Sequence, residues 1–469
     1  MKKKILYYNW IQFDEAEKRG GGVTVYQKNL IDELCKNENY EIHFISSGVE
    51  YNFLKKRTYI EKTKNIYGNK CHSYKIINSS IPAPGITIID SLTELEENKS
   101  LKEIFRNFLK EKGPFDVIHF NNLEGISLDI LDLKQEFRET KFIYSLHNYY
   151  FCCPKVTLWK DNEVNCVSVD QKECRKCIQY DINLKKLKVL GNLFYFFNKF
   201  NISHKYILKL LNILKNLKNN KKYFSQEENF DYKYFKRIMM EKINHNVDKV
   251  LAVSERVKEI GVLSGIDSSK IEVLYIGTKF AKFQLRKCIS PKEKETFKIA
   301  YFGYMKKEKG FYFFIECLKK LDSKITQNID VLLATKITDT SILSDIEDLK
   351  KNYHSIILKD GYTHEEIKTL MKDINLGVVP VLWEDNLPQV AIEFVANGVP
   401  ILTSDLGGAK ELGKISEFIF KNNNIEEFNS KLINIFNNRK LLDSFFENQI
   451  ELESLENHIK KLEKIYFYI

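Results

Sequence analysis

Two series of short apolar runs alternate with helical patterns along this chain, and this alternation constrains the fold more than any other feature. The first series reads KILYYN, EIHFIS, FDVIHF, KFIYSL and KVLAVS, and the second reads FKIAYFG, DVLLAT, SIILKD, NLGVVPV and PILTSD. Apolar strands separated by helices form βαβ units, in which the strands lie parallel and helices cover both faces of the sheet. The sequence therefore predicts an α/β chain with two doubly wound, Rossmann-like domains.

Length, composition and charge add further constraints. With 469 residues the chain is too long for one ordinary core, and with 43% hydrophobic residues it does not have the composition of a disordered protein. Its formal net charge of +10 favours anionic partners such as phosphates, a membrane surface or nucleic acid.

The apolar run at the beginning of the sequence is interrupted by Asn9, Gln12 and Asp14, so it lacks the core of a secretory signal. No run of 18 apolar residues indicates a spanning helix, and five of the nine cysteines cluster between positions 152 and 177 instead of forming a chain-wide disulfide framework. We therefore expect a cytoplasmic protein.

Composition also suggests where the domains begin and end. The charged stretch at 280–297 has no periodic apolar face and is predicted to be a linker. The first domain then covers 1–283 and the second 284–450, followed by a helix over 451–469. The surplus length of the first domain falls at about 150–245, which predicts an insertion that contains cysteines and helices.

The insertion carries a strongly basic segment. Between 185 and 222 there are ten lysines, six aromatic residues and no acidic residue, and apolar side chains recur at helical spacing at Ile207, Leu210, Leu211, Leu214 and Leu217. This pattern suits a helix that lies on an anionic membrane surface. A basic amphipathic pattern is a weak signal on its own, and an ordinary helix with a solvated lysine face is the more common explanation.

Four cysteines of the insertion have a spacing that could bind a metal. Cys174 and Cys177 form a Cys-x-x-Cys pair, with Cys153 and Cys166 upstream. Four thiolates can complete a tetrahedral structural zinc site, whereas the alternative is a set of reduced, buried cysteines. Redox chemistry is a third, weaker interpretation.

The stretch EDNLPQVAIEFVANGVP in the second series contains a helix with an acid on either side of its first turn. Pro388 suits that first turn, Asn386 or Leu387 is expected to cap it, and Gly398 is expected to end it. Asp385 then lies in the loop before the helix, and Glu393 lies about one and a half turns inside it.

The helix start between these acids offers free N–H groups around Asn386, Leu387 and Gln389, together with the positive end of the helix dipole. Because an apolar strand, LGVVPV, ends just upstream, the site is expected at the carboxyl edge of a sheet, where open α/β sheets bind ligands.

Two glycine-containing loops are further candidates for phosphate or sugar binding. Gly303 follows a strand and Lys309 stands six positions later, which allows close approach of backbone amides and supplies a positive charge. Gly20, Gly21 and Gly22 precede a helix but do not form a GxGxxG fingerprint, so a dehydrogenase is disfavoured.

His147 follows the strand KFIYSL at its carboxyl end, where its side chain is expected to face the cleft. Taken alone, such a histidine is more often structural than catalytic.

Together these motifs resemble the retaining, nucleotide-sugar-dependent glycosyltransferases of the family 4 type, whose GT-B fold has two Rossmann-like domains facing a central cleft. The strongest match is PVLWEDNLPQVAIEFVANGVPILTSDLGG, which has the family's two acids separated by seven residues and followed by Gly, Pro and a double glycine. The segments VLAVSERVKEIGVLSGIDSSKIEVLYIGT, KIAYFGYMKKEKGFYFFIECL and GGGVTVYQKNL carry the rest of the resemblance.

The resemblance implies roles for the site residues. Glu393 binds the ribose of the donor, while Asp385 and the amides around Asn386 to Gln389 hold the transferred sugar. Lys309 neutralises the diphosphate, next to the glycine loop at Gly303. Gly21 and Gly22 lie beside the sugar phosphate, and His147 contacts the sugar near the reacting centre.

The sequence departs from the family pattern at two positions. Tyr304 stands where an arginine usually follows the glycine of the phosphate loop, and Asp385 stands where the first acid is commonly Glu. Glu384 is therefore kept as an alternative reader of the sugar. The resemblance also implies that the C-terminal helix, with Ile459 and Leu462 at helical spacing, crosses back to the first domain, whereas a plain terminal helix would stay on the second.

The implied function is transfer of a sugar from a nucleoside-diphosphate sugar to a glycan or lipid-linked glycan in bacterial surface polysaccharide synthesis, with retention of configuration. It needs no catalytic cofactor and involves no nucleic acid; contact with the inner face of the membrane is an expectation from charge. A non-catalytic protein with a decayed site and a sugar-nucleotide epimerase remain alternatives. A glycosidase is disfavoured because Glu393 accompanies glycines and a lysine that suit a phosphate.

Overall fold

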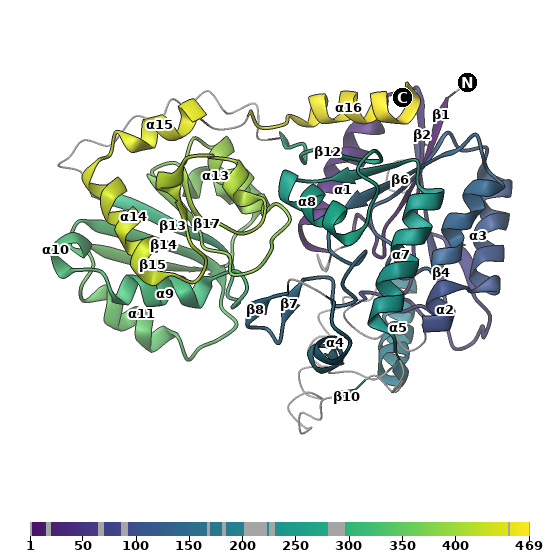
Figure 1. Cartoon of the computed structure of the whole chain (residues 1–469), viewed down its shortest axis with the longest axis horizontal. Coiled ribbons are helices and arrows are strands. Elements are labelled where there is room, and N and C mark those ends of the chain that lie inside the picture. The colour runs from purple at the N-terminus through teal and green to yellow at the C-terminus, as the bar shows by residue number, and fades with distance from the viewer. Residues whose placement is uncertain are drawn as a thin grey trace.

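The computed structural model describes most of the chain as two α/β domains joined side by side (Figure 1). The description covers residues 2–15, 20–63, 70–85, 92–166, 169–180, 184–200, 223–224, 230–279, 296–448 and 451–468. Most of the predicted linker at 280–297 and the apolar positions from Ile207 to Leu217 of the basic segment lie outside these residues.

The first domain is built on an eight-stranded sheet. Its strands run in the order β12 (Ile271–Val273), β11 (Lys249–Ala252), β6 (Lys141–Leu146), β5 (Val117–Phe120), β1 (Lys3–Tyr8), β2 (Tyr40–Ser46), β4 (Cys71–Ile77) and β3 (Tyr59–Lys62). All neighbours are parallel except β3 and β4. The central strand β1 pairs Ile5 with Ile42 on one side and with Val117 on the other.

Alternate side chains of β1 enter two different hydrophobic cores, because successive residues of a strand point to opposite faces. Ile5 and Tyr7 pack in the core that includes helix α1 (Gly21–Leu34). Leu6 and Tyr8 pack in the core on the opposite face. That face is covered by α2 (Leu92–Glu96), α3 (Lys99–Lys112), the 3₁₀ helix η2 (Leu128–Gln135) and α7 (Tyr232–Asn246). Helix α8 (Glu255–Ser264) connects β11 to β12.

The insertion between β6 and α7 contains short elements on the lower side of the first domain in Figure 1. A hairpin, β7 (Trp159–Lys160) and β8 (Val164–Asn165), is followed by α4 (Gln171–Cys177), the pair β9 (Gln179–Tyr180) and β10 (Tyr223–Phe224), and α5 (Leu184–Lys199). The hairpin lies between the two domains in Figure 1.

The second domain has a six-stranded parallel sheet in the strand order typical of Rossmann folds. Along the sheet the order is β15 (Ser355–Asp360), β14 (Ile329–Lys336), β13 (Phe297–Tyr304), β16 (Leu376–Val379), β17 (Ile401–Ser404) and β18 (Ile419–Phe420). Its helices are α9 (Phe311–Lys319), α10 (Ser323–Thr326), α11 (Leu343–Lys350), α12 (His364–Leu370), α13 (Gln389–Ala396), η4 (Ala409–Glu411), η5 (Ser416–Phe418), α14 (Ile425–Asn437) and α15 (Leu441–Asn448). The predicted α/β architecture with two doubly wound domains is confirmed, and each strand predicted from an apolar run is present.

The last helix, α16 (Leu455–Phe467), lies on the first domain (Figure 1). Leu462 and Tyr466 are buried in the same core as Ile5 and helix α1. The sequence left two places open for this helix, and the structure shows the crossed-over one. The two crossing segments meet where Thr278 donates its N–H to Glu453 O at 2.9 Å and accepts from Leu455 N at 3.2 Å.

Two helix starts differ from the predictions. Helix α13 begins at Gln389 with Pro388 as the cap, so neither Asn386 nor Leu387 caps it. Helix α1 begins at Gly21, so Gly21 and Gly22 form its first turn instead of preceding it. Burial of the later residues of α1 offsets the low helix propensity of glycine in this first turn.

Candidate active site

A cleft of about 470 Å³ lies between the domains, at the carboxyl ends of strands from both sheets. It is lined by Gly21, Gly22, His147, Gly303, Lys309, Asp385, Asn386, Leu387, Pro388, Gln389 and Glu393, among others. The structure thus brings together all the predicted catalytic and donor-binding residues except Glu384.

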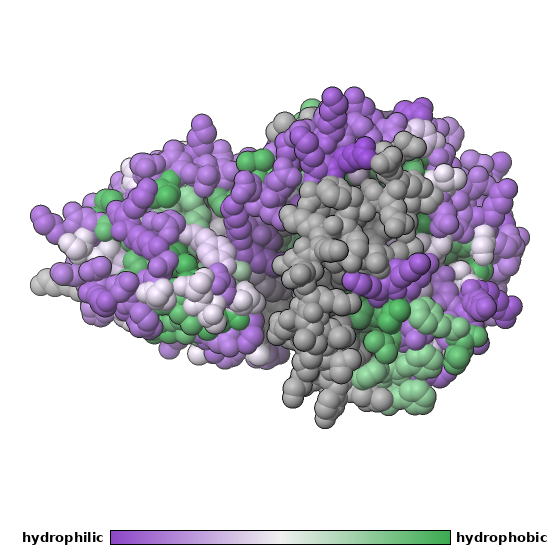
Figure 2. Space-filling model, turned by 90° about the horizontal axis from the view of Figure 1, so that it is seen from below, coloured by the Kyte–Doolittle hydropathy of each residue, from purple (hydrophilic) through white to green (hydrophobic). Residues whose placement is uncertain are grey.

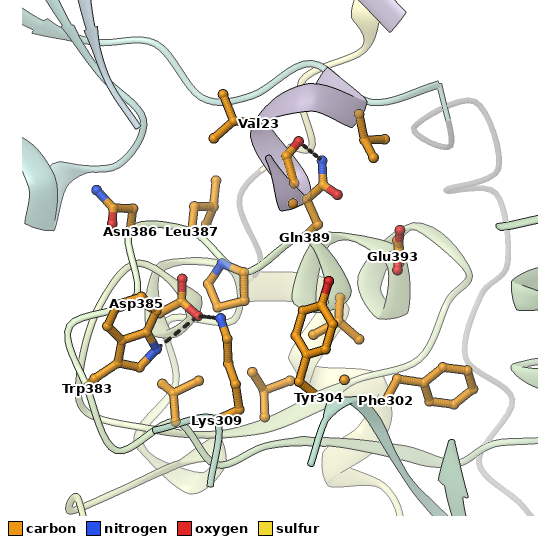
Figure 3. A pocket seen from close by; sticks show the side chains of 18 of the residues that line it. Val23, Phe302, Tyr304, Lys309, Trp383, Asp385, Asn386, Leu387, Gln389 and Glu393 are labelled. Atoms are coloured by element: carbon orange, nitrogen blue, oxygen red, sulfur yellow. Dashed lines mark hydrogen bonds and ion pairs between the residues drawn. The ribbon is translucent and has the colours of Figure 1, made fainter. Parts of the chain in front are cut away.

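Asp385 and Lys309 pair with each other on the second-domain side of the cleft (Figure 3). Lys309 Nζ lies 2.5 Å from Asp385 Oδ2, and the Trp383 indole N–H donates to the same oxygen at 3.3 Å. Lys309 Nζ also lies 4.9 Å from the centre of the Trp383 ring, in cation–π contact. The two residues predicted to touch the sugar and the diphosphate therefore form an ion pair with each other in this structure.

Glu393 projects from α13 near the other side of the cleft. In Figure 3 the Asp385–Lys309 pair and Glu393 lie on either side of Tyr304, whose side chain is 55% exposed. Glu393 itself is only 6% exposed, so a group that reaches its carboxylate must enter the cleft.

Glu384 does not line the cleft. Its carboxylate binds the Arg256 guanidinium through two bonds of 2.6 and 3.1 Å and accepts the N–H of Gly407 at 3.0 Å. These partners hold both carboxylate oxygens, so the structure does not support Glu384 as a reader of the sugar.

Glycines around the Asp385 loop permit an unusually close backbone approach. Gly407 has φ +61°, and a Cβ there would lie 2.1 Å from the carbonyl oxygen of Asp385. Gly310, with φ +74°, would place a Cβ 1.7 Å from Pro380 O. Gly407, the first member of the double glycine of LTSDLGG, thus allows its backbone to pack directly against the backbone of Asp385.

His147 is held on the first-domain side by neutral partners. Its Nε2 lies 3.2 Å from Asn121 Oδ1, and its ring lies 5.2 Å from the Tyr26 ring. Burial, with a smaller contribution from His458, lowers the pKa of His147 to about 3. The imidazole is therefore neutral near pH 7 and suited to hydrogen bonding with a sugar.

The next residue, Asn148, also lines the cleft and is oriented by a buried acid. Its Nδ2 donates to Glu124 Oε1 at 2.7 Å. Burial raises the pKa of Glu124 to about 7, partly offset by hydrogen bonds from Gly85 N–H and Asn148. Glu124 thus fixes the position of a neighbour of His147 without entering the cleft.

Sequence reasoning missed several residues of the cleft wall. Lys336 is the last residue of strand β14, and Tyr362 follows the end of strand β15 by two positions. Trp383 stands two positions before Asp385. The rule that ligands bind at carboxyl strand ends could have found Lys336. Val156 and Thr157, which come from the insertion, carry no local signal.

The four cysteines of the insertion line one small cavity of about 200 Å³. Burial raises the pKa of the Cys153 thiol to about 11 and that of Cys174 to about 12, so both are protonated near pH 7. Among the described residues, the one group that brings three candidate ligand atoms within 4.8 Å of one another is Glu41, His43 and His72, and it contains none of these cysteines.

One family of known proteins matches the second domain of this chain. Residues 284–452 match the family described as glycosyl transferases group 1. The match spans the second domain, which is therefore similar to group 1 glycosyltransferase domains. No curated protein matches the chain at a significant level.

Solved glycosyltransferase structures resemble the whole chain. Sucrose-phosphate synthase from Thermosynechococcus elongatus is 14% identical with a TM-score of 0.56, covering 99% of this chain and 98% of its own. A lipopolysaccharide outer core galactosyltransferase is 11% identical with a TM-score of 0.58 and full coverage of both chains, 100% each. Anabaena HepE in complex with UDP and glucose is 12% identical with a TM-score of 0.53, again covering 100% of each chain. At these identities the likeness shows the fold, which is GT-B.

None of the described helices is long and apolar enough to cross a membrane.

Proposed function

We propose that this protein is a retaining glycosyltransferase of the family 4 type, which transfers a sugar from a nucleoside-diphosphate sugar to a glycan or lipid-linked glycan. The observation that carries the proposal is the convergence of Asp385, Lys309 and Glu393 around the start of α13, inside a cleft between two Rossmann-like domains. The group 1 domain match and the GT-B fold support it.

The proposed donor position follows from charge. Lys309 exchanges its bond to Asp385 for the incoming diphosphate, which frees the Asp385 carboxylate to accept hydroxyl groups of the transferred sugar. Glu393, deeper in the helix, accepts the ribose hydroxyls. The backbone amides at the start of α13 stabilise the charge that develops on the leaving diphosphate.

Lys336 is our candidate for the charge that the usual arginine would supply at Tyr304. Its side chain lines the cleft from the end of β14 and bonds Asp360 Oδ2 at 2.8 Å. It therefore offers a second cation on the same side as Lys309, and the departing diphosphate is held by two lysines.

The reaction needs no metal among these residues. Holding donor and acceptor in line of approach lowers the barrier through orientation, and His147, which is neutral, contacts the sugar near the reacting carbon. Retention means that the acceptor approaches from the face the diphosphate leaves. Proton NMR of the product's anomeric signal tests retention directly, because an inverted product would contradict it.

The central test is calorimetric titration of the protein with UDP, GDP and other nucleoside diphosphates. We expect micromolar binding of one of them, weakened about 10- to 100-fold in Lys309→Ala and Glu393→Ala because each loses a charge-assisted contact. Lys307→Ala is the matched control, since this lysine is 52% exposed in its side chain and pairs with Glu163 outside the cleft lining. Absence of binding for every nucleotide would favour the decayed-site alternative, which Tyr304 suggests.

The proposed acceptor is a growing bacterial surface polysaccharide on a lipid carrier, reached from the inner face of the membrane. Exposed apolar side chains gather around α5 and the loop before β3: Phe53, Leu54, Val189 and Phe200 are 50, 82, 48 and 65% exposed. Lys185 and Lys186 are exposed on the same helix. Figure 2 shows a hydrophobic area on the underside of the first domain, beside hydrophilic residues.

Such a combination of apolar and basic groups suits an anionic lipid surface. Co-sedimentation with anionic liposomes at low salt is expected, with loss of binding in Phe53→Ser/Leu54→Ser and with neutral liposomes. Equal recovery in the supernatant with and without anionic liposomes would overturn the membrane part alone.

We also propose a structural zinc ion for Cys153, Cys166, Cys174 and Cys177, supported by their spacing and by the single cavity that they line. Zinc binding requires deprotonation of the thiols, and the sulfur atoms must approach one another, because no three of them lie within 4.8 Å of each other. The prediction is one zinc per chain by mass spectrometry of unchelated protein, lost in Cys174→Ser/Cys177→Ser. Protein without zinc would contradict the proposal and favour the alternative of reduced, buried cysteines.

A further inference from the structure

The hairpin β7–β8 extends from the cysteine-containing insertion of the first domain to the loop that carries Asp385 in the second. Its turn uses Asp161 and Asn162 at φ +53° and +60°, and Asn165 ends its second strand. The hairpin belongs to the first domain by chain connection, yet Asn165 and Glu163 make polar contacts with the second.

Asn165 makes a reciprocal pair of hydrogen bonds across the domain boundary. Its Nδ2 donates to Leu382 O at 2.7 Å, and its Oδ1 accepts from Glu384 N–H at 2.9 Å. One side-chain amide thus pairs with the backbone on both sides of Trp383, as a neighbouring strand would.

The bridged segment is the one that shapes the donor site. Trp383 donates to the Asp385 carboxylate, and Leu382 N–H donates to Glu308 O at 2.9 Å, next to Lys309. A shift of the backbone at 382–384 would therefore move Trp383 and alter the distance between Asp385 and Lys309.

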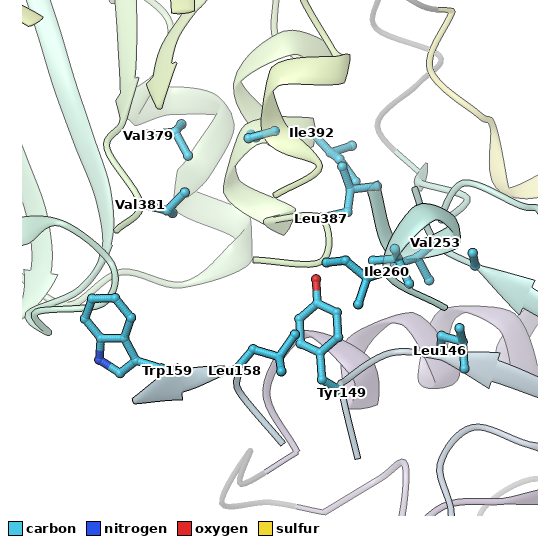
Figure 4. Packing of buried hydrophobic residues seen from close by; sticks show 14 of the residues in the cluster. Leu146, Tyr149, Leu158, Trp159, Val253, Ile260, Val379, Val381, Leu387 and Ile392 are labelled. Carbon is cyan, nitrogen blue, oxygen red and sulfur yellow. The ribbon is translucent and has the colours of Figure 1, made fainter. Parts of the chain in front are cut away.

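The base of the hairpin is rigid enough to fix Asn165. Trp159 is 4% exposed and packs in the hydrophobic core with Leu158. Figure 4 shows these two side chains and Tyr149 facing residues of the second domain such as Val381 and Leu387. Lys160 forms an ion pair with Glu173 of α4, and Cys166 N–H donates to Leu158 O at 2.7 Å.

We propose that Asn165 is a positioning residue of the donor site, through which the cysteine-containing insertion holds the Leu382–Asp385 loop in its working conformation when the domains are closed. The inference rests on the proposed glycosyltransferase function for its kinetic consequence. Its structural part, the fixing of the loop by Asn165, is independent of that function.

The structural part is tested by hydrogen exchange of the full-length protein, read on peptides that contain Glu384. In Asn165→Ala the Glu384 amide loses its acceptor, so it should exchange about ten-fold faster, whereas Val164→Ala, an exposed position on the same hairpin, should leave it unchanged. Unchanged exchange in Asn165→Ala overturns the proposal, whatever the protein catalyses.

The kinetic part is tested with the nucleoside diphosphate and sugar donor that bind the wild-type protein. We expect Asn165→Ala to lower kcat about ten-fold and to weaken diphosphate binding less than Lys309→Ala does, because the Lys309 and Glu393 side chains are both retained. Asn165→Asp, which keeps the acceptor for Glu384 N–H but loses the donor to Leu382 O, should recover part of kcat.

The two failures are distinguishable. If wild-type protein binds no nucleotide, the proposed function fails and hydrogen exchange alone decides the role of Asn165. If wild-type protein transfers sugar and Asn165→Ala does so at the same rate, the positioning role is wrong and the function stands. An equal drop in Val164→Ala would assign the effect to general loosening of the hairpin and would also overturn the role of Asn165.

Discussion

The two contacts that join the domains differ in chemistry. Helix α16 is attached to the first domain by apolar side chains such as Leu462 and Ile465, which are 2 and 6% exposed. The contact along the cleft has an apolar part around Leu387. Its polar part consists of an ion pair between Arg256 and Glu384 and hydrogen bonds from Asn165 to the 382–384 backbone. In addition, Gln389 donates to Gly22 O at 3.0 Å. The free energy of apolar burial is lost when a contact opens, whereas polar groups that separate form hydrogen bonds with water instead, at little net cost. We infer that α16 stays attached while the cleft opens and closes.

The α16 contact also contains the buried polar side chains of His458 and Tyr466, and each of them is hydrogen-bonded to residues of the first domain. His458 Nδ1 lies 2.9 Å from the carbonyl oxygen of Tyr275, so Nδ1 carries the proton and Nε2 accepts from the Tyr26 hydroxyl at 2.8 Å. Tyr466 bonds His119 and the Tyr7 hydroxyl. Because Tyr26 also packs on His147, the terminal helix supports a residue of the cleft.

The largest expected effect is on the apolar contact. Leu462→Ala should lower the free energy of unfolding by about 2–5 kcal/mol, since it leaves a cavity between α16 and the first domain. Thermal denaturation measures the change, and Lys460→Ala, 62% exposed on the same helix, is the control. An equal, small effect of both variants would mean that α16 is not firmly attached.

Acid pH should weaken the same contact. Burial lowers the pKa of His458 to about 4, whereas an unfolded histidine titrates near 6.5. The unfolded state therefore binds more protons between these values, and stability falls as the pH drops from about 6.5 toward 4, by on the order of 2 kcal/mol at pH 5. Denaturation curves from pH 8 to pH 5 measure this. His458→Gln should show a shallower fall, and an unchanged profile would contradict the assignment.

A smaller effect is expected where Glu411 caps α8 across the cleft. Its carboxylate accepts the N–H groups of Glu255 and Arg256 at 2.9 and 2.8 Å. Glu411→Ala should cost about 1 kcal/mol and shift the domains toward an open arrangement, visible as a larger radius of gyration in small-angle scattering. Asp405→Ala on the same domain is a comparison without a contact to α8, and an unchanged radius in Glu411→Ala would show that closure depends on the other bonds.

The smallest effect belongs to the exposed pair between the hairpin tip and the second domain. Lys307 Nζ lies 3.3 Å from Glu163 Oε1, with side chains 52 and 67% exposed. Glu163→Ala should change stability by less than about 0.5 kcal/mol, because solvent and salt screen such pairs. A loss comparable to that of Glu411→Ala would mean that the cleft contact depends on charge more than on backbone bonds.

Local patterns predicted most of the fold. The apolar runs gave the central strands of both sheets because a buried parallel strand is apolar along its length. The strands β3, β4, β12 and β18 were not predicted. They are short or lie at or near a sheet edge, and β4 includes polar residues such as His72 and Ser73, so the apolar signal is weak.

The candidate site was partly predictable for the same reason. The residues from Asp385 to Glu393 and the glycine loop with Lys309 are contiguous in sequence, and strand ends bring them to one edge. The Asp385–Lys309 pair, the turning of Glu384 toward Arg256 and the contribution of Asn165 were not predicted. Each joins residues that are far apart in the chain.

The sequence by itself determined that this chain forms two parallel α/β domains and that the residues around the start of α13 lie at the carboxyl edge of a sheet, because periodicity and helix ends depend on near neighbours. The tertiary structure decided which acid faces the cleft, where α16 attaches and which residue of the insertion holds the Asp385 loop. These outcomes depend on how two separately formed domains pack, and no local spacing encodes that packing.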